Sequence, residues 1–105
     1  MRTTKVLELV HTDLCGPMEV ESMGGSNYFM LFIDDYSRMT WVFFLSYKSE
    51  ALGLFKSFKA MVETQTGARL KALRSYRGGE FQSKEFKQFC EKEVSATAIN
   101  HSIHT

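Results

Sequence analysis

The sequence has little of what marks secreted, membrane-spanning or strongly DNA-coating proteins. Its two cysteines, Cys15 and Cys90, lie far apart, which favours two reduced thiols in an intracellular protein. The longest apolar stretch, residues 28–33, is much shorter than the ~20 residues that cross a bilayer. The first residues lack the apolar segment of a signal peptide, and the three histidines complete no zinc-site spacing with the cysteines. We therefore expect an intracellular protein with no membrane segment.

Neither sign of charge dominates. Thirteen Lys and Arg residues stand against twelve Asp and Glu, for a net charge of +1, and this balance neither supports nor excludes a nucleic-acid partner. The hydrophobic residues amount to 44% and the aromatic residues to 13% of the chain. That is enough for a core, so the length of 105 residues indicates one small domain over residues 1–105.

The apolar pattern predicts strands first. Residues 6–13 indicate a strand that ends before Gly16 and Pro17. Residues 28–33 are apolar at every position, which is typical of a strand buried on both faces. A polar turn at residues 34–38 leads to a third run, residues 39–45, so these three strands form an antiparallel meander.

The period then becomes helical. Ser49 is placed to cap a helix with Glu50 in its first turn, and Gly67 is placed to end it. The predicted core face holds Ala51, Phe55, Phe58 and Val62, and the solvent face holds Lys56, Lys59 and Glu63. A fourth strand over residues 69–76, a helix over residues 83–93 with a stripe of Phe86, Phe89 and Cys90, and a short fifth strand over residues 94–99 follow. The fold class is therefore mixed α/β, with the first helix as the crossover to a parallel strand.

Four blocks in the same order resemble the catalytic core of copia-type retrotransposon integrases, in the ribonuclease H-like superfamily. They are residues 7–18 (LELVHTDLCGPM), 28–38 (YFMLFIDDYSR), 40–42 (TWV), and 73–75 with 77–81 (LRS and RGGEF). The resemblance covers residues 5 to 93. It implies a five-stranded mixed sheet, a piece of a Pol polyprotein, DNA as partner, self-association and a nuclear location. The C-terminal helices of that core are expected to be missing here, which would expose apolar surface.

Members of this family hold two Mg²⁺ or Mn²⁺ ions with two aspartates and a glutamate. Two ions roughly 4 Å apart assist phosphodiester transfer by activating the attacking oxygen and stabilising the leaving oxygen, and Mg²⁺ prefers carboxylate oxygens. Asp13 matches the first aspartate; the pattern alone also allows a turn residue before Gly16. The second position is occupied by Tyr76, whose phenol has a pKa near 10 and offers a cation no charge at neutral pH. The third carboxylate is expected after the fifth strand, and the sequence resembles the family at no such position.

Other polar residues leave alternatives open. Asp34 and Asp35 are expected to form a turn that pairs with Arg38, and Glu80 to lie in a loop at the rim of the site. Lys71, Arg74, Arg77 and Lys84 are expected to cluster at the edge of the former active site, either as phosphate contacts or as an ordinary solvated face.

Three hypotheses follow. The chain is an inactive integrase core fragment, part of an active transferase whose sequence is truncated, or a non-catalytic nucleic-acid- or protein-binding module derived from the element. We favour the first, because only Asp13 remains of the three ligands. For the same reason, restoring aspartate at Tyr76 alone should not give activity.

Overall fold

The protein forms one mixed five-stranded sheet with two helices. The computed structural model describes residues 3–17, 27–76, 84–94 and 96–100. The elements are β1 (Val10–Cys15), β2 (Tyr28–Asp34), β3 (Thr40–Leu45), a 3₁₀ turn (Lys48–Glu50), α1 (Ala51–Thr66), β4 (Ala72–Tyr76), α2 (Lys84–Glu93) and β5 (Ala96–Asn100). The strand order is β3-β2-β1-β4-β5. β1, β2 and β3 are antiparallel neighbours, whereas β4 is parallel to both β1 and β5, so the predicted fold class and crossover are confirmed.

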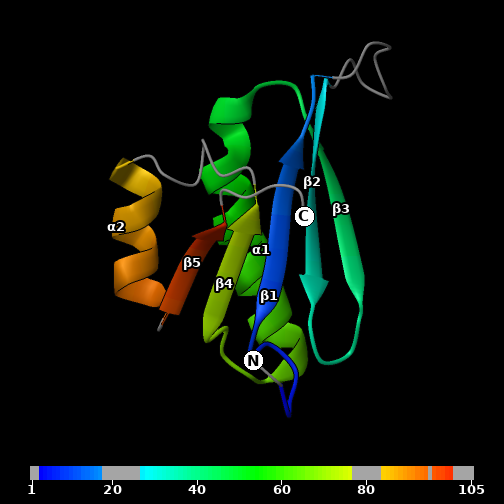
Figure 1. Cartoon of the computed structure of the whole chain (residues 1–105), viewed down its shortest axis with the longest axis vertical. Coiled ribbons are helices and arrows are strands. Elements are labelled where there is room, and N and C mark those ends of the chain that lie inside the picture. The colour runs from blue at the N-terminus through cyan, green and yellow to red at the C-terminus, as the bar shows by residue number, and fades with distance from the viewer. Residues whose placement is uncertain (1–2, 18–26, 77–83, 95, 101–105) are drawn as a thin grey trace.

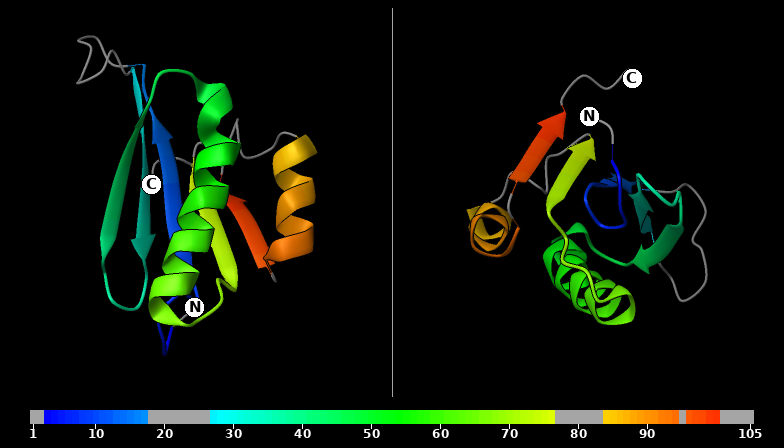
Figure 2. Two further views of the ribbon diagram at one scale, coloured as in Figure 1. Left: turned by 180° about the vertical axis from the view of Figure 1, so that it is seen from behind. Right: turned by 90° about the horizontal axis from the view of Figure 1, so that it is seen from below.

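Both helices lie on the same face of the sheet. Figure 1 shows the other face toward the viewer with α1 behind it. In Figure 2, the left view, from behind, brings α1 in front of the sheet, and the right view, from below, shows α1 and α2 on the same side of the sheet. The helices contact each other through Phe55 and Phe86, whose rings stack 5.2 Å apart. No helix of the described residues covers the opposite face, which we call the open face.

The core lies between the sheet and α1. Phe32 from the middle of β2 is fully buried and stacks on Phe58 of α1, with ring centroids 3.9 Å apart and planes 7° from parallel. Phe55 packs beside Phe32 at 6.1 Å. The predicted core face of α1 is confirmed, since Ala51, Phe55, Phe58 and Val62 are all buried. Burying such side chains contributes roughly 1.5–3 kcal/mol each, so this layer fixes the position of β1 and β2.

The ends of α1 differ from the prediction in two respects. Ser49 lies inside the 3₁₀ turn and does not cap α1; the Glu50 carboxylate instead accepts hydrogen bonds from the backbone N–H groups of Ser46 (2.8 Å) and Tyr47 (3.1 Å). Lys59, predicted on the solvent face, is buried, with 6% of its surface exposed. Its Nζ contacts Glu63 at 3.0 Å, because an ammonium group can be buried when a carboxylate pairs with it.

The prediction at the end of α1 is confirmed. Gly67 has a φ of 73° and its N–H donates to the Glu63 carbonyl at 2.9 Å. The Glu63 carboxylate also accepts the N–H of Leu70 at 2.7 Å. The helix end is thereby tied to the segment that leads into β4, which sets where β4 enters the sheet beside β1.

Two strand predictions were wrong in detail. β1 begins at Val10, because Leu7 takes a left-handed conformation (φ 63°) that interrupts an extended chain. β2 is fully buried on the helix side only: Met30 and Phe32 are buried, whereas Leu31 and Ile33 are half-buried on the open face. A continuous apolar run therefore does not distinguish a strand covered on both faces from one covered on a single face.

Candidate nucleic-acid and metal site on the open face

Asp13 and Tyr76 are cross-strand neighbours. β1 and β4 run parallel, and their register pairs His11 with Arg74 and Asp13 with Tyr76. The two positions that the family resemblance assigns to metal-binding aspartates are therefore adjacent in the fold although 63 residues separate them in the sequence (76 − 13). Only one of the two is a carboxylate.

Asp13 lies on the open face, beside a small cavity. The cavity has a volume of about 170 Å³ and is lined by β1 and β2, through His11, Thr12, Asp13, Leu31 and Ile33. Asp13 is partly buried, and its Oδ2 lies 3.7 Å from the Cys15 Sγ, which donates to it. His11, Thr12 and Asp13 supply the polar residues of the lining, and Leu31 and Ile33 the apolar ones. A carboxylate in such surroundings can accept hydrogen bonds or contribute one ligand to a cation, but it supplies a single negative charge.

Gly16 sets the path of the chain after Asp13. Its φ is 135°, and a Cβ atom there would lie 2.6 Å from a ring carbon of Tyr28 and 2.7 Å from the carbonyl oxygen of Asn27. Only glycine fits both the conformation and the space. The glycine that follows Asp13 thus lets the end of β1 pass close to the start of β2.

Asp34 has a structural role, as a buried connector. It is 1% exposed, and its two carboxylate oxygens accept the N–H of Leu7 at 2.7 Å and the N–H of Ser37 at 2.8 Å. The turn contact with Ser37 agrees with the predicted turn, but the contact with Leu7 joins the turn to the segment before β1. The sequence predicted that Asp34 pairs with Arg38, and this prediction was wrong for the Asp34 side chain, which binds the two backbone N–H groups instead.

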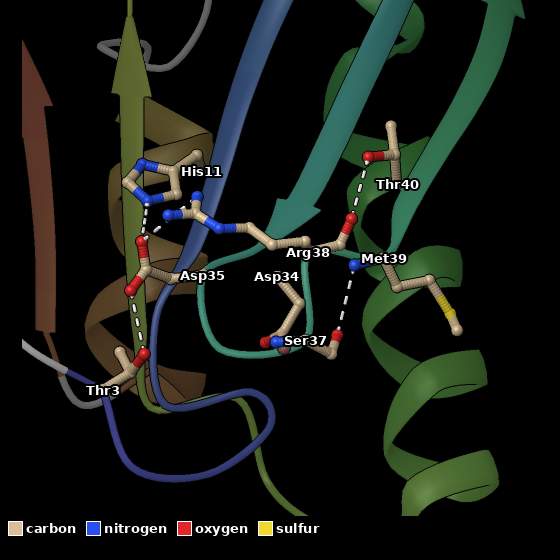
Figure 3. Close-up of polar contacts among 8 residues, drawn as sticks. All are labelled: Thr3, His11, Asp34, Asp35, Ser37, Arg38, Met39 and Thr40. Atoms are coloured by element: carbon tan, nitrogen blue, oxygen red, sulfur yellow. Dashed lines mark hydrogen bonds and ion pairs between the residues drawn. The ribbon is translucent and has the colours of Figure 1, made fainter.

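Asp35 holds His11 in place. Asp35 Oδ1 lies 2.8 Å from His11 Nε2, and Asp35 Oδ2 accepts a hydrogen bond from Thr3 Oγ1 at 2.8 Å (Figure 3). The Arg38 guanidinium lies 3.9 Å from the same carboxylate. The predicted ion pair between this turn and Arg38 is therefore present at Asp35, at a longer distance than the contacts with His11 and Thr3. The hydrogen bonds from His11 and Thr3 lower the pKa of Asp35 below its ordinary value. Neither contact was predicted, because both join residues more than 20 positions apart.

The three described basic residues of the predicted cluster, Lys71, Arg74 and Lys84, lie on different parts of the fold. Arg74 pairs with His11 across β1 and β4 and is partly buried, and Lys84 opens α2 and is exposed. Lys71 lies at the other end of β4, where its N–H donates to the Leu7 carbonyl. Lys71 is five positions before Tyr76, which corresponds to about 16 Å along an extended chain. The predicted grouping of Lys71 at the edge of the site was therefore wrong.

Lys71 has a different neighbour. A hydrogen bond from Lys5 and the positive charge of Lys5 lower the pKa of Lys71. Arg77 and Glu80, two further predicted residues of the site rim, lie outside the described residues. The position after β5 where the resemblance places a third carboxylate also lies outside them.

Among the described residues, the side chains near Asp13 do not make up a donor set for two divalent ions. Within residues 3–17, 27–76, 84–94 and 96–100, no three His, Cys, Asp or Glu side chains are grouped so that they could hold a metal ion. Asp34 and Asp35 are engaged by backbone and His11, and the strand position beside Asp13 carries a phenol. Hard cations need several oxygen ligands with negative charge, and Asp13 provides one.

Comparison with known proteins identifies the family. The integrase core domain family matches residues 3–103. The chain belongs to the integrase core domain family. A retrovirus-related Pol polyprotein from transposon TNT 1-94 of Nicotiana tabacum is 52% identical over 109 residues, covering 97% of this chain and 8% of that protein. A second Pol polyprotein, from transposon RE2 of Arabidopsis thaliana, is 33% identical over 79 residues, covering 75% of this chain and 5% of that protein.

This integrase core also has structural neighbours. A chain in the cryo-EM structure of a simian T-cell lymphotropic virus intasome, in complex with the PP2A regulatory subunit B56 gamma, superposes with a TM-score of 0.70. It is 14% identical, and the match covers all of this chain and 35% of that chain. The likeness supports the ribonuclease H-like fold predicted from the sequence. The integrase core thus corresponds to a small part of a retrotransposon Pol polyprotein, and this assignment is favoured over a derived binding module.

Among the helices that the structure describes in this integrase core, none has the length and apolar character that crossing a bilayer requires. Family members use divalent metals. In this chain, the described strand positions at the corresponding site hold one carboxylate, Asp13, beside Tyr76.

Proposed function

We propose that this integrase core binds DNA through phosphate contacts at the end of the sheet where β1 and β4 finish, without catalysing metal-dependent strand transfer. One observation carries the proposal: the register places Asp13 beside Tyr76, so the pair of strand positions that should share the metal ions holds a single carboxylate. Removing one of two negative ligands weakens both the charge and the geometry of a hard-cation site.

Metal binding tests this proposal directly. Mn²⁺ binding, measured by water-proton relaxation, should be weak in the parent chain. Tyr76→Asp should bind Mn²⁺ at least roughly tenfold more tightly, because a second carboxylate then stands beside Asp13, and tenfold corresponds to about 1.4 kcal/mol. The matched control is Tyr76→Asp combined with Asp13→Asn, which should return to the weak binding of the parent.

Activity is the second measurement. With Mg²⁺ or Mn²⁺ and a labelled DNA duplex, neither the parent nor Tyr76→Asp should nick or join DNA, since two carboxylates do not complete the family's set of three. Metal-dependent cleavage by the parent that Asp13→Asn abolishes would show that the lack of catalysis proposed here is wrong. Phenylalanine at Tyr76 serves as a further control, because it removes the hydroxyl without adding charge.

The DNA-binding part rests on Arg74. Arg74 lies in register with His11, near Asp13 on the same strand pair. Lys71 lies at the other end of β4, five positions before Tyr76. In a fluorescence anisotropy titration at low salt, Arg74→Ala should therefore raise the dissociation constant several-fold and reduce its salt dependence by about one phosphate contact. Lys71→Ala removes the same charge away from the site and should have a smaller effect. Equal effects, or no binding at low salt, would contradict the proposal.

A further inference from the structure

A cavity lies between the segment that enters β4 and the end of α2. It has a volume of about 310 Å³ and is lined by residues 69–71 on one side and residues 91–94 on the other; we call it the β4–α2 cavity. Figure 1 shows β4 beginning and α2 ending at the same end of the sheet, opposite to the end where β1 and β4 finish. Sites for small molecules usually measure about 300–1,000 Å³, so the cavity suits a small ligand.

Backbone contacts fix both sides of the β4–α2 cavity. On the β4 side, the Leu70 N–H donates to the Glu63 carboxylate at 2.7 Å, and the Lys71 N–H donates to the Leu7 carbonyl at 3.0 Å. On the α2 side, Val94 is buried and its N–H closes the last turn of the helix. The side chains that line the cavity therefore extend from backbone positions that the fold holds in place.

Two lysines meet on the β4 side of the cavity. The backbone contact with Leu7 brings the N-terminal segment alongside Lys71, and the Lys5 amine forms a hydrogen bond with the Lys71 amine. This hydrogen bond and the positive charge of Lys5 lower the pKa of Lys71. The charge of Glu8 acts in the opposite direction and does not offset them; its carboxylate accepts hydrogen bonds from Thr4. An anion between the two amines would relieve the repulsion between their charges.

The α2 side of the cavity has a different character. Glu91 and Glu93 belong to its lining together with Lys92. The end of a helix also carries a partial negative charge, because its last carbonyl groups have no partner within the helix. A bare anion is repelled on this side, whereas hydroxyl groups find acceptors. The two sides of the cavity therefore suit two different chemical groups.

We propose that the β4–α2 cavity binds a small phosphomonoester that also carries hydroxyl groups, such as a sugar phosphate. The phosphate lies between Lys5 and Lys71, with the Arg69 side of the lining next to it. The hydroxyl groups donate to Glu93 and to the carbonyl groups at the end of α2.

Charge and hydroxyl content separate this ligand from duplex DNA. A phosphomonoester carries close to two negative charges at neutral pH, which matches the two amines of Lys5 and Lys71. Each phosphate of the DNA backbone carries one negative charge, and its sugar hydroxyls are used in the ester bonds. The cavity is therefore distinct in both position and chemistry from the phosphate contacts proposed at the other end of the sheet.

Isothermal titration calorimetry with ribose 5-phosphate tests the site. Lys71→Ala should raise the dissociation constant at least about tenfold, the loss expected for a hydrogen bond to a charged group. Alanine keeps the backbone N–H that donates to the Leu7 carbonyl, so the fold is retained. Lys84→Ala is the matched control, because it removes the same charge at the start of α2 and should leave the dissociation constant unchanged. A parent chain that binds no ribose 5-phosphate at millimolar concentration, or equal losses in both variants, would overturn the proposal.

Glu93→Gln tests the division of the cavity into two sides. The substitution should raise the dissociation constant of ribose 5-phosphate several-fold, because the hydroxyl groups lose a charged acceptor. It should lower the dissociation constant of inorganic phosphate, because a repelling charge is removed. Shifts in the same direction for both probes, or inorganic phosphate that binds the parent as tightly as ribose 5-phosphate, would contradict a site for a hydroxylated phosphomonoester.

Proton uptake and DNA competition complete the test. A phosphate between the two amines favours the charged form of Lys71, so titrations at about pH 9 in buffers of different ionisation enthalpy should show proton uptake on binding. Lys71→Ala should abolish that uptake. The other charged groups around Lys71 are Lys5 and Glu8 in the N-terminal segment, Arg69 before β4, and Glu91, Lys92 and Glu93 in α2. A DNA duplex with hydroxyl ends should not displace ribose 5-phosphate; displacement would show a site for the nucleic-acid backbone and refute the proposal.

Discussion

Asp34 and Asp13 are two carboxylates in neighbouring strands of one sheet, and their surroundings differ in kind. Asp34 is 1% exposed and accepts two backbone N–H groups from segments 27 and 3 residues away. Asp13 is partly buried beside a 170 Å³ cavity on the open face, with a cysteine thiol and a cross-strand tyrosine position as neighbours. The first carboxylate holds the fold together. The second lines a surface cavity, where our proposal gives it contact with a ligand, so acidic residues in neighbouring strands can differ completely in role.

Removing Asp34 should have the largest effect. Asp34→Ala leaves the N–H groups of Leu7 and Ser37 without an acceptor, and each such loss costs about 1–3 kcal/mol. We expect the free energy of unfolding, from urea denaturation followed by circular dichroism, to fall by about 3 kcal/mol. Asp34→Asn keeps one acceptor and should cost about half as much. A loss below about 1 kcal/mol for Asp34→Ala would mean that the turn does not depend on this carboxylate.

Asp35 should show an intermediate effect that depends on pH. The hydrogen bonds from His11 and Thr3 hold its pKa below the ordinary value of 3.8. The charged form is therefore favoured by folding, and its contribution to stability is present above pH 4 and is lost as pH falls through the lowered pKa. We expect Asp35→Asn to lower the melting temperature at pH 7 by roughly 4–8 °C, the shift for about 1 kcal/mol.

The pH dependence supplies the control for Asp35. The difference in melting temperature between the parent and Asp35→Asn should shrink only as pH falls below about 4 and through the lowered pKa, because the parent carboxylate becomes protonated there. A difference that stays constant over this range would show that the hydrogen bonds to Asp35 do not depend on its charge.

Asp13 should have the smallest effect on stability. Its side chain is only partly buried at the surface of the sheet, and the Cys15 thiol that donates to it at 3.7 Å is a weak donor. Asp13→Asn should therefore change the free energy of unfolding by less than about 1 kcal/mol, measured by the same urea titration. The same substitution should nevertheless abolish the Mn²⁺ binding that Tyr76→Asp introduces. If Asp13→Asn destabilised the chain as much as Asp34→Ala, the distinction between a structural and a ligand-facing carboxylate would be lost.

Sequence reasoning located the helices and strands well, because their side-chain periods depend on local pattern. The period of Phe55, Phe58 and Val62 gave the buried face of α1, and Gly67 gave its end. The errors fall where a distant residue decides the local structure. Leu7, for example, takes a left-handed conformation and its N–H donates to Asp34, 27 residues further along the chain.

The candidate site divides in the same way. The family blocks predicted Asp13 and the substitution at Tyr76, and the structure adds that the two positions lie side by side in register. The separation of Lys71 from Tyr76, by contrast, follows from the predicted strand itself, because five positions of extended chain span about 16 Å. The His11–Asp35 contact required β1 and β2 to be paired first.

The sequence by itself determined the order of elements, the family and the identity of the residue at each ligand position. These follow from local periodicity and from motifs read along the chain. Only the tertiary structure decided which acidic residue supports the fold and which one faces the open side. The physical reason is that hydrogen-bond partners, burial and strand order depend on segments far apart in the sequence, and these come together only when the sheet forms.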